Sequence, residues 1–299
     1  MSSLPQSTIQ NPKSSDLLIV ITGPTASGKS ALALDLAERY NGEIICADSR
    51  TVYRGMDIGT AKPTVEEQAR VPHHLLDVVD PDERFTAADF QRLARAAIDD
   101  IRARGRIPFV VGGTGLYIDG LVLGYQFGPS ADETIRRQLE DLTAEQLQTM
   151  LINQRISLPH NRDNKRHLVR ALEQHGINNN RGEKPCENCI VVAIATEKDE
   201  LGQRIRQRAD VMFAGGIVDE AKLLAARYGW DHEALTGNIY PIVRRLIDGE
   251  ISEDEAKELF IIKDRQLVNK QLTWLRRHDY VRWLTLGDAR GYLSLIIKR

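Results

Sequence analysis

Hydrophobic residues along the first half of the chain alternate between short continuous runs and helical spacing. Apolar runs of strand length occur at 17–22, 43–47, 107–111 and 190–195. Residues 29–40 and 85–105, which lie between such runs, instead carry apolar side chains at a spacing typical of helices. Strands that alternate with helices predict an α/β fold with a parallel sheet, whose ligands bind at the carboxyl ends of the strands.

The pattern changes after Gly124 to polar, amphipathic helices at 132–141 and 143–153. From residue 197 onward the chain is predicted to be almost entirely helical, with N-caps at Thr196 and Ser252. We therefore predict a P-loop NTPase-like core, a small helical insertion, a largely helical C-terminal part and a disordered N-terminal tail. The predicted boundaries are 1–15 for the tail, 16–123 and 165–299 for the core, and 124–164 for the insertion.

Composition narrows the class of protein. Of the 299 residues, 42% are hydrophobic and the net charge is −2, which argues against a surface coated with basic charge for non-specific nucleic-acid binding. The tail lacks the apolar segment of a signal peptide, and no run approaches a membrane span, so a soluble, cytoplasmic protein is expected. Basic residues nevertheless cluster in two places, where they either bind a partner or form a solvated helix face: Arg162, Lys165, Arg166 and Arg170, and Lys263, Arg265, Lys270, Arg276 and Arg277.

The segment GPTASGKS at 23–30 matches the phosphate-binding pattern G-x-x-x-x-G-K-[ST]. In this pattern backbone N–H groups surround phosphate oxygens, Lys29 neutralises charge and Ser30 offers its hydroxyl to Mg²⁺. A predicted strand precedes the segment and a predicted helix follows it, as the pattern requires. The predicted diphosphate-binding residues are Gly23, Pro24, Thr25, Ala26, Ser27, Gly28, Lys29 and Ser30.

Two further residues follow predicted strands and should therefore face the same cleft. Asp48 comes directly after the strand at 43–47, where its carboxylate is a candidate Mg²⁺ ligand, general base or structural cap. Thr114 stands in a G-G-T-G corner and is either a hydrogen-bond donor to the leaving oxygen or a turn residue. Cys186 and Cys189 form a C-x-x-C pair, but no second pair follows at zinc-finger spacing, so this pair is expected to be metal-free and dispensable for activity.

Five segments together resemble the tRNA dimethylallyltransferase family over nearly the whole chain after the tail. They are GPTASGKS at 23–30, DSRTVYRGMDIGTAKP at 48–63, PHHLLD at 72–77, GGTGLY at 112–117 and RQLVNKQLTW at 265–274. The resemblance implies that the loop at 23–30 holds the diphosphate of dimethylallyl diphosphate, with Mg²⁺, and not ATP. It implies transfer of the prenyl group to N6 of adenosine 37, in the anticodon loop of tRNAs that read codons beginning with U.

Site roles follow from the same resemblance. The implied catalytic residues are Asp48, as the base that takes the N6 proton, with Thr114 and Lys29. The implied tRNA contacts are Asp48, Ser49, Arg50, Thr51, Thr114, Arg136, Arg166, Arg170, Arg265, Gln266, Lys270, Gln271 and Trp274. Eukaryotic members of the family carry a C-terminal zinc finger, and this sequence shows none, so it resembles the bacterial type. A monomer is expected.

Two positions depart from the family pattern. Thr51 stands where the family usually has Gln, and Thr236 stands where it places an arginine. Arg244, Arg245 and Arg265 are candidates to replace the missing charge. The alternatives to tRNA prenylation are prenylation of free adenine nucleotides, a P-loop small-metabolite kinase, and a non-catalytic RNA-binding protein, which the presence of Asp48 argues against.

Overall fold

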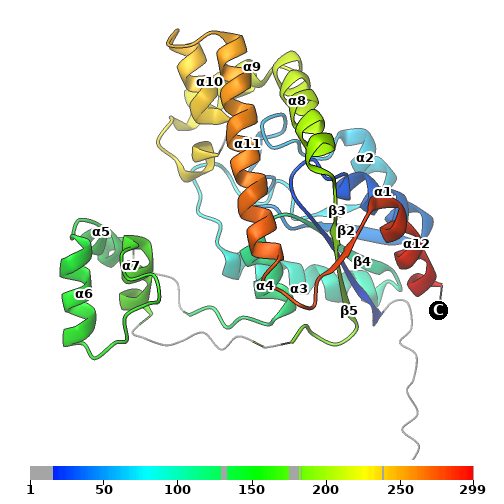
Figure 1. The fold of residues 1–299 in the computed structure, drawn as a ribbon, viewed down its shortest axis with the longest axis horizontal. Coiled ribbons are helices and arrows are strands. Elements are labelled where there is room, and N and C mark those ends of the chain that lie inside the picture. Colours follow the sequence, from blue (N-terminus) through cyan, green and yellow to red (C-terminus); the bar gives the residue numbers. More distant parts are fainter. Residues whose placement is uncertain (1–15, 129–132, 175–181, 183, 238, 299) are drawn as a thin grey trace, which may run out of the picture. The chain divides into compact units, whose positions relative to one another are not determined.

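A computed structural model describes residues 16–128, 133–174, 182, 184–237 and 239–298. The predicted disordered tail at 1–15 lies outside the described residues. Six parallel strands form one sheet in the order β3-β2-β4-β1-β5-β6 (Figure 1). The strands are β1 (Leu18–Thr22), β2 (Gly42–Cys46), β3 (His73–His74), β4 (Ile107–Gly112), β5 (Cys189–Ile194) and β6 (Arg282–Leu284).

The central strands are buried on both faces, which explains why they are continuous apolar runs and not alternating ones. Helices α1 (Lys29–Arg39) and α12 (Leu286–Ile297) contribute Leu36 and Leu293 to a core on one side of the sheet. Helices α3 (Ala87–Ala103) and α4 (Gly115–Val122) pack against each other, and α3 also packs on β2 and β4. The predicted α/β class with a parallel sheet is confirmed.

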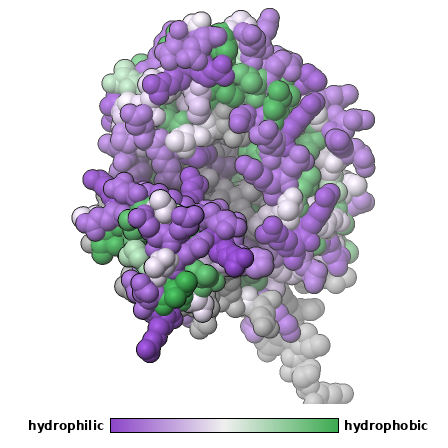
Figure 2. Space-filling view, turned by 60° about the vertical axis from the view of Figure 1, so that its left-hand side comes forward, coloured by the Kyte–Doolittle hydropathy of each residue, from purple (hydrophilic) through white to green (hydrophobic). Residues whose placement is uncertain are grey.

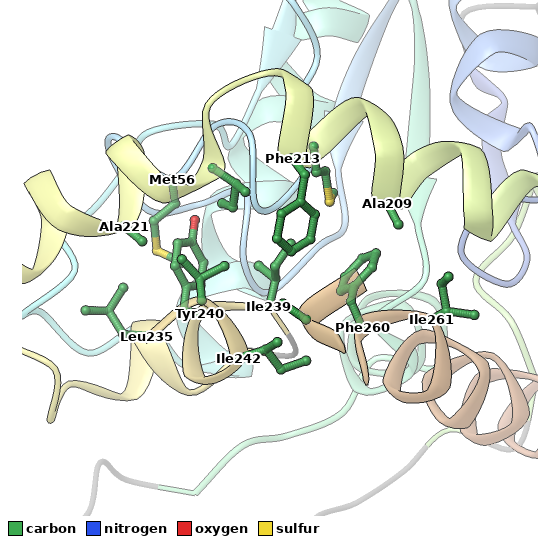
Figure 3. Packing of buried hydrophobic residues seen from close by; sticks show 14 of the residues in the cluster. Met56, Ala209, Phe213, Ala221, Leu235, Ile239, Tyr240, Ile242, Phe260 and Ile261 are labelled. Carbon is green, nitrogen blue, oxygen red and sulfur yellow. The ribbon is translucent and has the colours of Figure 1, made fainter. Parts of the chain in front are cut away.

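A second hydrophobic core lies among the C-terminal helices, where Phe213, Tyr240 and Phe260 pack together (Figure 3). It joins the helices α8 (Lys198–Ala214), α9 (Ile217–Tyr228), η2 (Glu233–Thr236), α10 (Tyr240–Ile247) and α11 (Glu253–Leu275). Val52 and Met56, from the chain that follows β2, are also buried in this core. The C-terminal helices therefore fix the segment that begins with Asp48.

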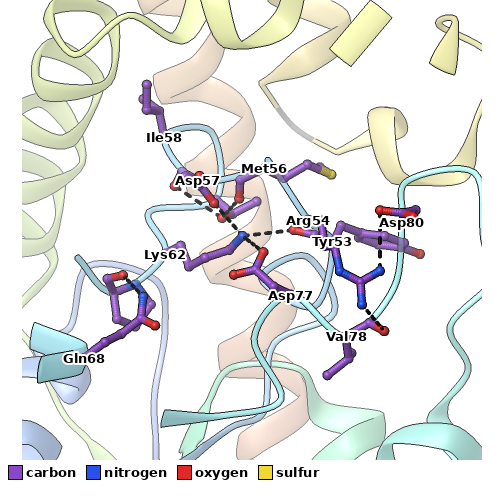
Figure 4. Close-up of polar contacts among 12 residues, drawn as sticks. Tyr53, Arg54, Met56, Asp57, Ile58, Lys62, Gln68, Asp77, Val78 and Asp80 are labelled. Carbon is purple, nitrogen blue, oxygen red and sulfur yellow. Dashed lines mark hydrogen bonds and ion pairs between the residues drawn. The ribbon is translucent and has the colours of Figure 1, made fainter. Parts of the chain in front are cut away.

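Polar contacts hold the rest of that segment (Figure 4). The Lys62 side chain is only 3% exposed, and its Nζ donates to the Tyr53 carbonyl at 2.9 Å and to carboxylates of Asp57 at 2.5 Å and Asp77 at 2.6 Å. The Glu220 carboxylate accepts hydrogen bonds from three successive backbone N–H groups, at 57, 58 and 59, at 2.6 to 2.9 Å. The charged side chains of Lys62 and Glu220 thus bind backbone groups of this long loop that no helix or sheet pairs.

The chain divides into two compact units, Met1–Val122 with Lys184–Arg299, and Leu123–Glu183. The smaller unit contains α5 (Glu133–Glu140), α6 (Ala144–Asn153) and α7 (Lys165–Glu173) around a core of Leu147, Leu151 and Leu168. The predicted insertion ended at 164, but the helical unit continues to 183. The reason is that one apolar face of α7 packs on α5 and α6, so this helix belongs to the insertion and not to the core.

Several local predictions differ from the structure. Ser252 is the predicted N-cap of α11 and forms a capping box with Glu255. The prediction that Thr196 is an N-cap was wrong, because the N-cap residue of α8 is Glu197, whose side chain makes no capping hydrogen bond. The short strands β3 and β6 and the six-residue helix α2 (Val65–Arg70) were not predicted, since two to six residues give too little periodicity.

The face of the molecule seen in Figure 2 is mainly hydrophilic, with hydrophobic side chains in small separate groups. Exposed large hydrophobic side chains come from different elements, among them Val65, Val211 and Leu223. Among the described residues, no helix is both long and apolar enough to cross a membrane.

Candidate active site

A cavity of about 1290 Å³ lies at the carboxyl ends of β1, β2 and β4. Its walls come from the loops that follow these strands, together with α8 and α11. Lys29, Asp48 and Thr114, predicted from three separate segments, all line it. The volume exceeds the usual range of about 300–1,000 Å³ for small-molecule pockets, so it has room for two reactants.

The loop between β1 and α1 forms part of the wall of this cavity. Gly23 and Gly28 have φ of 143° and 87°, and Ala26 has φ of 64°, so the loop turns through conformations that favour glycine. Helix α1 begins without a side-chain cap and has no acidic residue in its first turn. Its N-terminus therefore presents unsatisfied donors and a partial positive charge, which favour an anion.

The predicted diphosphate residues divide into a lining set and a supporting set. Thr25, Ala26, Gly28, Lys29 and Ser30 line the cavity. Gly23, Pro24 and Ser27 are buried beneath the loop, where the Pro24 carbonyl accepts from the Ser27 N–H at 3.2 Å and from Lys29 Nζ at 3.2 Å.

Lys29 is the cation whose pKa is most affected in this site. Burial lowers its pKa from 10.5 to about 8; Asp48 and Asp264 raise it, while Arg208 lowers it. A lysine that is poorly solvated and near other cations is stabilised in its charged form by an added anion. A bound diphosphate would therefore stabilise the charged form of Lys29.

Asp48 and Thr114 are held by the backbone of neighbouring loops. Asp48 Oδ1 accepts from the Arg50 N–H at 2.8 Å, and Thr114 Oγ1 accepts from the Ser49 N–H at 3.0 Å. A Cβ on Gly112 would lie 2.0 Å from the Ala47 carbonyl oxygen, so only glycine allows the two loops to approach this closely. Both side chains are thus fixed at one edge of the sheet, and the hydrogen bond from Arg50 is made to one of the two Asp48 carboxylate oxygens.

Helix α11 closes the other side of the cavity. The Gln271 side chain accepts from the Thr25 N–H at 2.9 Å and donates to the Gly113 carbonyl at 3.3 Å, so it joins the first loop to the G-G-T-G loop. A Cβ on Gly115 would lie 2.4 Å from the Trp274 ring, which shows how closely this helix approaches. Gln271 was predicted to contact tRNA; in the structure both ends of its amide bind the protein backbone.

Asp119 holds Trp274 from behind the cavity. The Asp119 side chain is 8% exposed. Its carboxylate accepts from Trp274 Nε1 at 3.0 Å and from the Tyr280 hydroxyl at 2.9 Å, and His278 Nε2 lies 3.3 Å away. Sequence reasoning missed Asp119, because nothing in the GGTGLY motif indicates which side chain of the helix that it begins contacts α11.

Other predicted tRNA residues lie in different places. Ser49, Arg50, Thr51, Lys270 and Trp274 line the cavity, whereas Arg265 and Gln266 are exposed on α11 and do not. In the helical unit Arg166 is exposed. Arg136 Nε pairs with the buried Glu173 at 3.0 Å, and Arg170 Nη1 lies 3.3 Å from the same carboxylate. The Arg136 pair joins α5 to α7, whereas the Arg170 pair lies within α7. For both arginines contact with tRNA stays a prediction.

Arg244, Arg245 and Arg265, the candidates to supply the charge of the missing arginine, do not line the cavity. Arg244 and Arg245 form exposed ion pairs with Asp248 and Glu250. Thr236 does line the cavity. Beside it, Arg50 Nη1 donates to the carbonyls of Glu233 and Ala234, at 2.7 and 3.1 Å.

Two arginines of α8 that the motifs did not single out also line the cavity. Arg204 Nη1 donates to the Ala26 carbonyl at 3.3 Å, and Arg208 lies 4.0 Å from the buried Asp264. The helical spacing of these two residues, one turn apart, was the available signal.

Comparison with known proteins agrees with this geometry. The family model described as IPP transferase matches residues 51–278. The chain belongs to this family. A tRNA dimethylallyltransferase of Geotalea uraniireducens is 43% identical over 290 residues, which cover 91% of this chain and 93% of that protein. One from Exiguobacterium is 40% identical and covers 93% of each.

Solved structures of the family share the fold. The full-length tRNA isopentenylpyrophosphate transferase of Bacillus halodurans has a TM-score of 0.72 and 35% identity, with coverage of 94% of this chain and 97% of that one. A eukaryotic dimethylallyltransferase acting on tRNA has a TM-score of 0.77 at 23% identity, over 93% of this chain and 77% of that one, and shows the fold alone.

Proposed function

We propose that this protein transfers the dimethylallyl group from dimethylallyl diphosphate to N6 of adenosine 37 in tRNA. The observation that carries the proposal is the meeting of an anion-binding loop with Asp48 and Thr114 in one cavity. The names of the relatives favour tRNA over free adenine nucleotide as the acceptor and favour a prenyltransferase over a kinase.

In this proposal the diphosphate lies at the N-terminus of α1. The loop N–H groups and Lys29 bind its oxygens, and Arg204 and Arg208 add positive charge near the loop. These groups stabilise the negative charge that develops as the bond between C1 and oxygen breaks, and the electron pair stays with the diphosphate.

The acceptor amine is proposed to lie between Asp48 and the donor. The N6 lone pair forms the new bond to C1, and the Asp48 carboxylate takes the N6 proton as that bond forms. Thr114, whose oxygen already accepts from Ser49, has its hydroxyl hydrogen available for the leaving oxygen.

Mg²⁺ is a proposed cofactor, and the residues present fit it. The Ser30 hydroxyl is exposed at the first turn of α1 and lines the cavity. The described residues contain no cluster of three or more His, Cys, Asp or Glu suited to a metal, which agrees with a Mg²⁺ held mainly by substrate oxygens and water. When bound, the ion would neutralise charge on the leaving diphosphate.

The direct test uses purified protein, dimethylallyl diphosphate, Mg²⁺ and unmodified tRNA with the sequence A36-A37-A38. Mass spectrometry of the digested tRNA should show N6-isopentenyladenosine at position 37. Prenylation of AMP but not of tRNA would support the adenylate alternative instead. A protein that hydrolyses ATP and leaves both acceptors unmodified would support the kinase alternative.

A further inference from the structure

Cys186 and Cys189 lie outside the active site, and the proposed reaction does not use them. They occupy the first and fourth positions of a turn that leads into β5, in which the Cys189 N–H donates to the Cys186 carbonyl at 3.3 Å. Asn188, the third residue, has φ of 56°, a conformation that asparagine tolerates better than most residues. A turn of this kind brings its first and fourth Cα atoms within about 7 Å.

That spacing suits a disulfide. Disulfides join Cα atoms about 4.4–6.8 Å apart, so the turn needs little rearrangement to bond its two sulfurs. The two side chains are close enough for each to shift the pKa of the other. Cys186 is exposed and Cys189 is partly buried, so only the first of the pair is open to a reagent in solution.

The surroundings of the two sulfurs differ in a way that favours exchange chemistry. The hydrogen bond from the Cys189 thiol lowers the pKa of Cys186 from 9.0 to about 7; burial opposes this shift, and Arg102 and Arg95 of α3 support it. The same hydrogen bond and burial raise the pKa of Cys189. An exposed thiolate backed by a protonated neighbour is the usual arrangement of an attacking and a resolving cysteine.

Arg102 provides an independent sign that this spot accommodates negative charge. One of its terminal nitrogens donates to the Asp16 carbonyl at 2.7 Å, while its Nε is buried without a hydrogen-bond partner among the described residues. Arg102 acts electrostatically on both cysteines, so a negative charge on Cys186 would reduce the cost of this buried cationic group.

We infer that Cys186 and Cys189 form a dithiol site that exchanges with low-molecular-weight disulfides. The Cys186 thiolate attacks one sulfur of the disulfide, a mixed disulfide forms and one thiolate leaves. Cys189 then loses its proton, its sulfur attacks Cys186 Sγ, and the second thiolate leaves. Two electrons pass from the protein to the small disulfide, which becomes two thiols after taking up the two protons.

The position of the turn determines what the bond would constrain. The Cys186 N–H donates to the Val122 carbonyl at 2.9 Å, so the turn ties together the segments at which the chain leaves and re-enters the larger unit. The new covalent loop is very short, and loop-closure entropy grows with loop length. We therefore expect the oxidation state to change thiol chemistry much more than global stability.

The test is exposure of the native protein to glutathione disulfide, followed by alkylation, proteolysis and mass spectrometry. The wild-type protein should lose two thiols, form a Cys186–Cys189 bond and retain no glutathione. Cys46 is an internal control, because it is buried and burial raises its pKa, so it should stay reduced.

Two variants separate the steps. Cys189→Ser should trap one glutathione on Cys186, and Cys186→Ser should slow all reaction at this turn at least tenfold. The pH profile of Cys186 alkylation should have a midpoint near 7 in the wild type and shift upward in Cys189→Ala, which has no side-chain hydrogen-bond donor. Transfer to tRNA, measured as above, should be unchanged in both reduced serine variants.

Three results would overturn the inference: stable glutathionylation of the wild type, a reaction rate at Cys186 no greater than that of a short unstructured C-x-x-C peptide, or stoichiometric zinc that protects both thiols.

Discussion

The two halves of the cavity bind charge in opposite ways. On the side of β1, the N-terminus of α1, Lys29 and the arginines of α8 gather positive charge around a loop that has no acidic residue of its own. On the side of β2, Asp48 places a carboxylate beside backbone donors and polar side chains. The first half, the donor half, suits the leaving diphosphate of the prenyl donor. The second, the acceptor half, suits an amine that gives up a proton. One cavity thus separates binding of the prenyl donor from activation of the acceptor.

Asp48→Asn should have the largest effect on turnover. Loss of a positioned general base lowers rates by about 10² to 10⁴, and the amide keeps the size of the side chain. Single-turnover measurements with saturating tRNA and donor are the appropriate check. A variant within threefold of wild type would show that Asp48 only caps its loop through the Arg50 N–H.

Lys29→Met should rank next. Removing one preorganised charge from a developing anion costs about 10² to 10³ in rate, and the donor should also bind more weakly. Arg204→Met is a useful comparison, since Arg204 reaches the same loop through a backbone carbonyl and should have a smaller effect. Equal losses in the two variants would mean that overall positive charge matters and not the position of Lys29.

The pH dependence of donor binding sharpens the same contrast. The protonated form of Lys29 binds the anion, and its pKa in the free protein is about 8, so affinity for the donor should fall as pH rises through 8. Below pH 7 Lys29 stays protonated, so its titration should add no pH dependence there. Calorimetry near pH 8 should show proton uptake on binding. Lys29→Met, which shares all other titrating groups, should lose this component, and an unchanged profile in that variant would contradict the assignment.

Asp119→Asn tests whether the carboxylate that holds Trp274 matters for binding of the acceptor. The asparagine amide can accept from only one side, so Trp274, Tyr280 and His278 cannot all keep their present contacts with it. We expect about a tenfold rise in KM for tRNA with little change in donor affinity. Trp274→Phe is the matched variant, because it removes the same hydrogen bond from the other side.

The sequence was sufficient for features that depend on local pattern. The strands at β1, β2, β4 and β5, the place of the loop at 23–28 between β1 and α1, and the convergence of Asp48 and Thr114 follow from apolar runs and from the rule that parallel strands share a carboxyl edge. Side chains whose partners lie far along the chain were not predictable. Gln271 bonds to Thr25, 246 positions away, and Glu220 binds backbone N–H groups more than 160 positions away. The membership of α7 in the helical unit was missed for the same reason, since its apolar face fits either unit until its packing is known.

Equilibrium dissociation constants of both substrates for wild type, Lys29→Met and Asp48→Asn test directly whether the cavity binds the donor and the acceptor in separate halves. A non-hydrolysable analogue of dimethylallyl diphosphate serves as the donor probe, and unmodified tRNA serves as the acceptor. We predict that Lys29→Met weakens donor binding at least tenfold and leaves tRNA binding within twofold. Asp48→Asn should leave donor binding within twofold while turnover falls. Weakened donor binding in Asp48→Asn to the same extent as in Lys29→Met would contradict the division of this cavity into a donor half and an acceptor half.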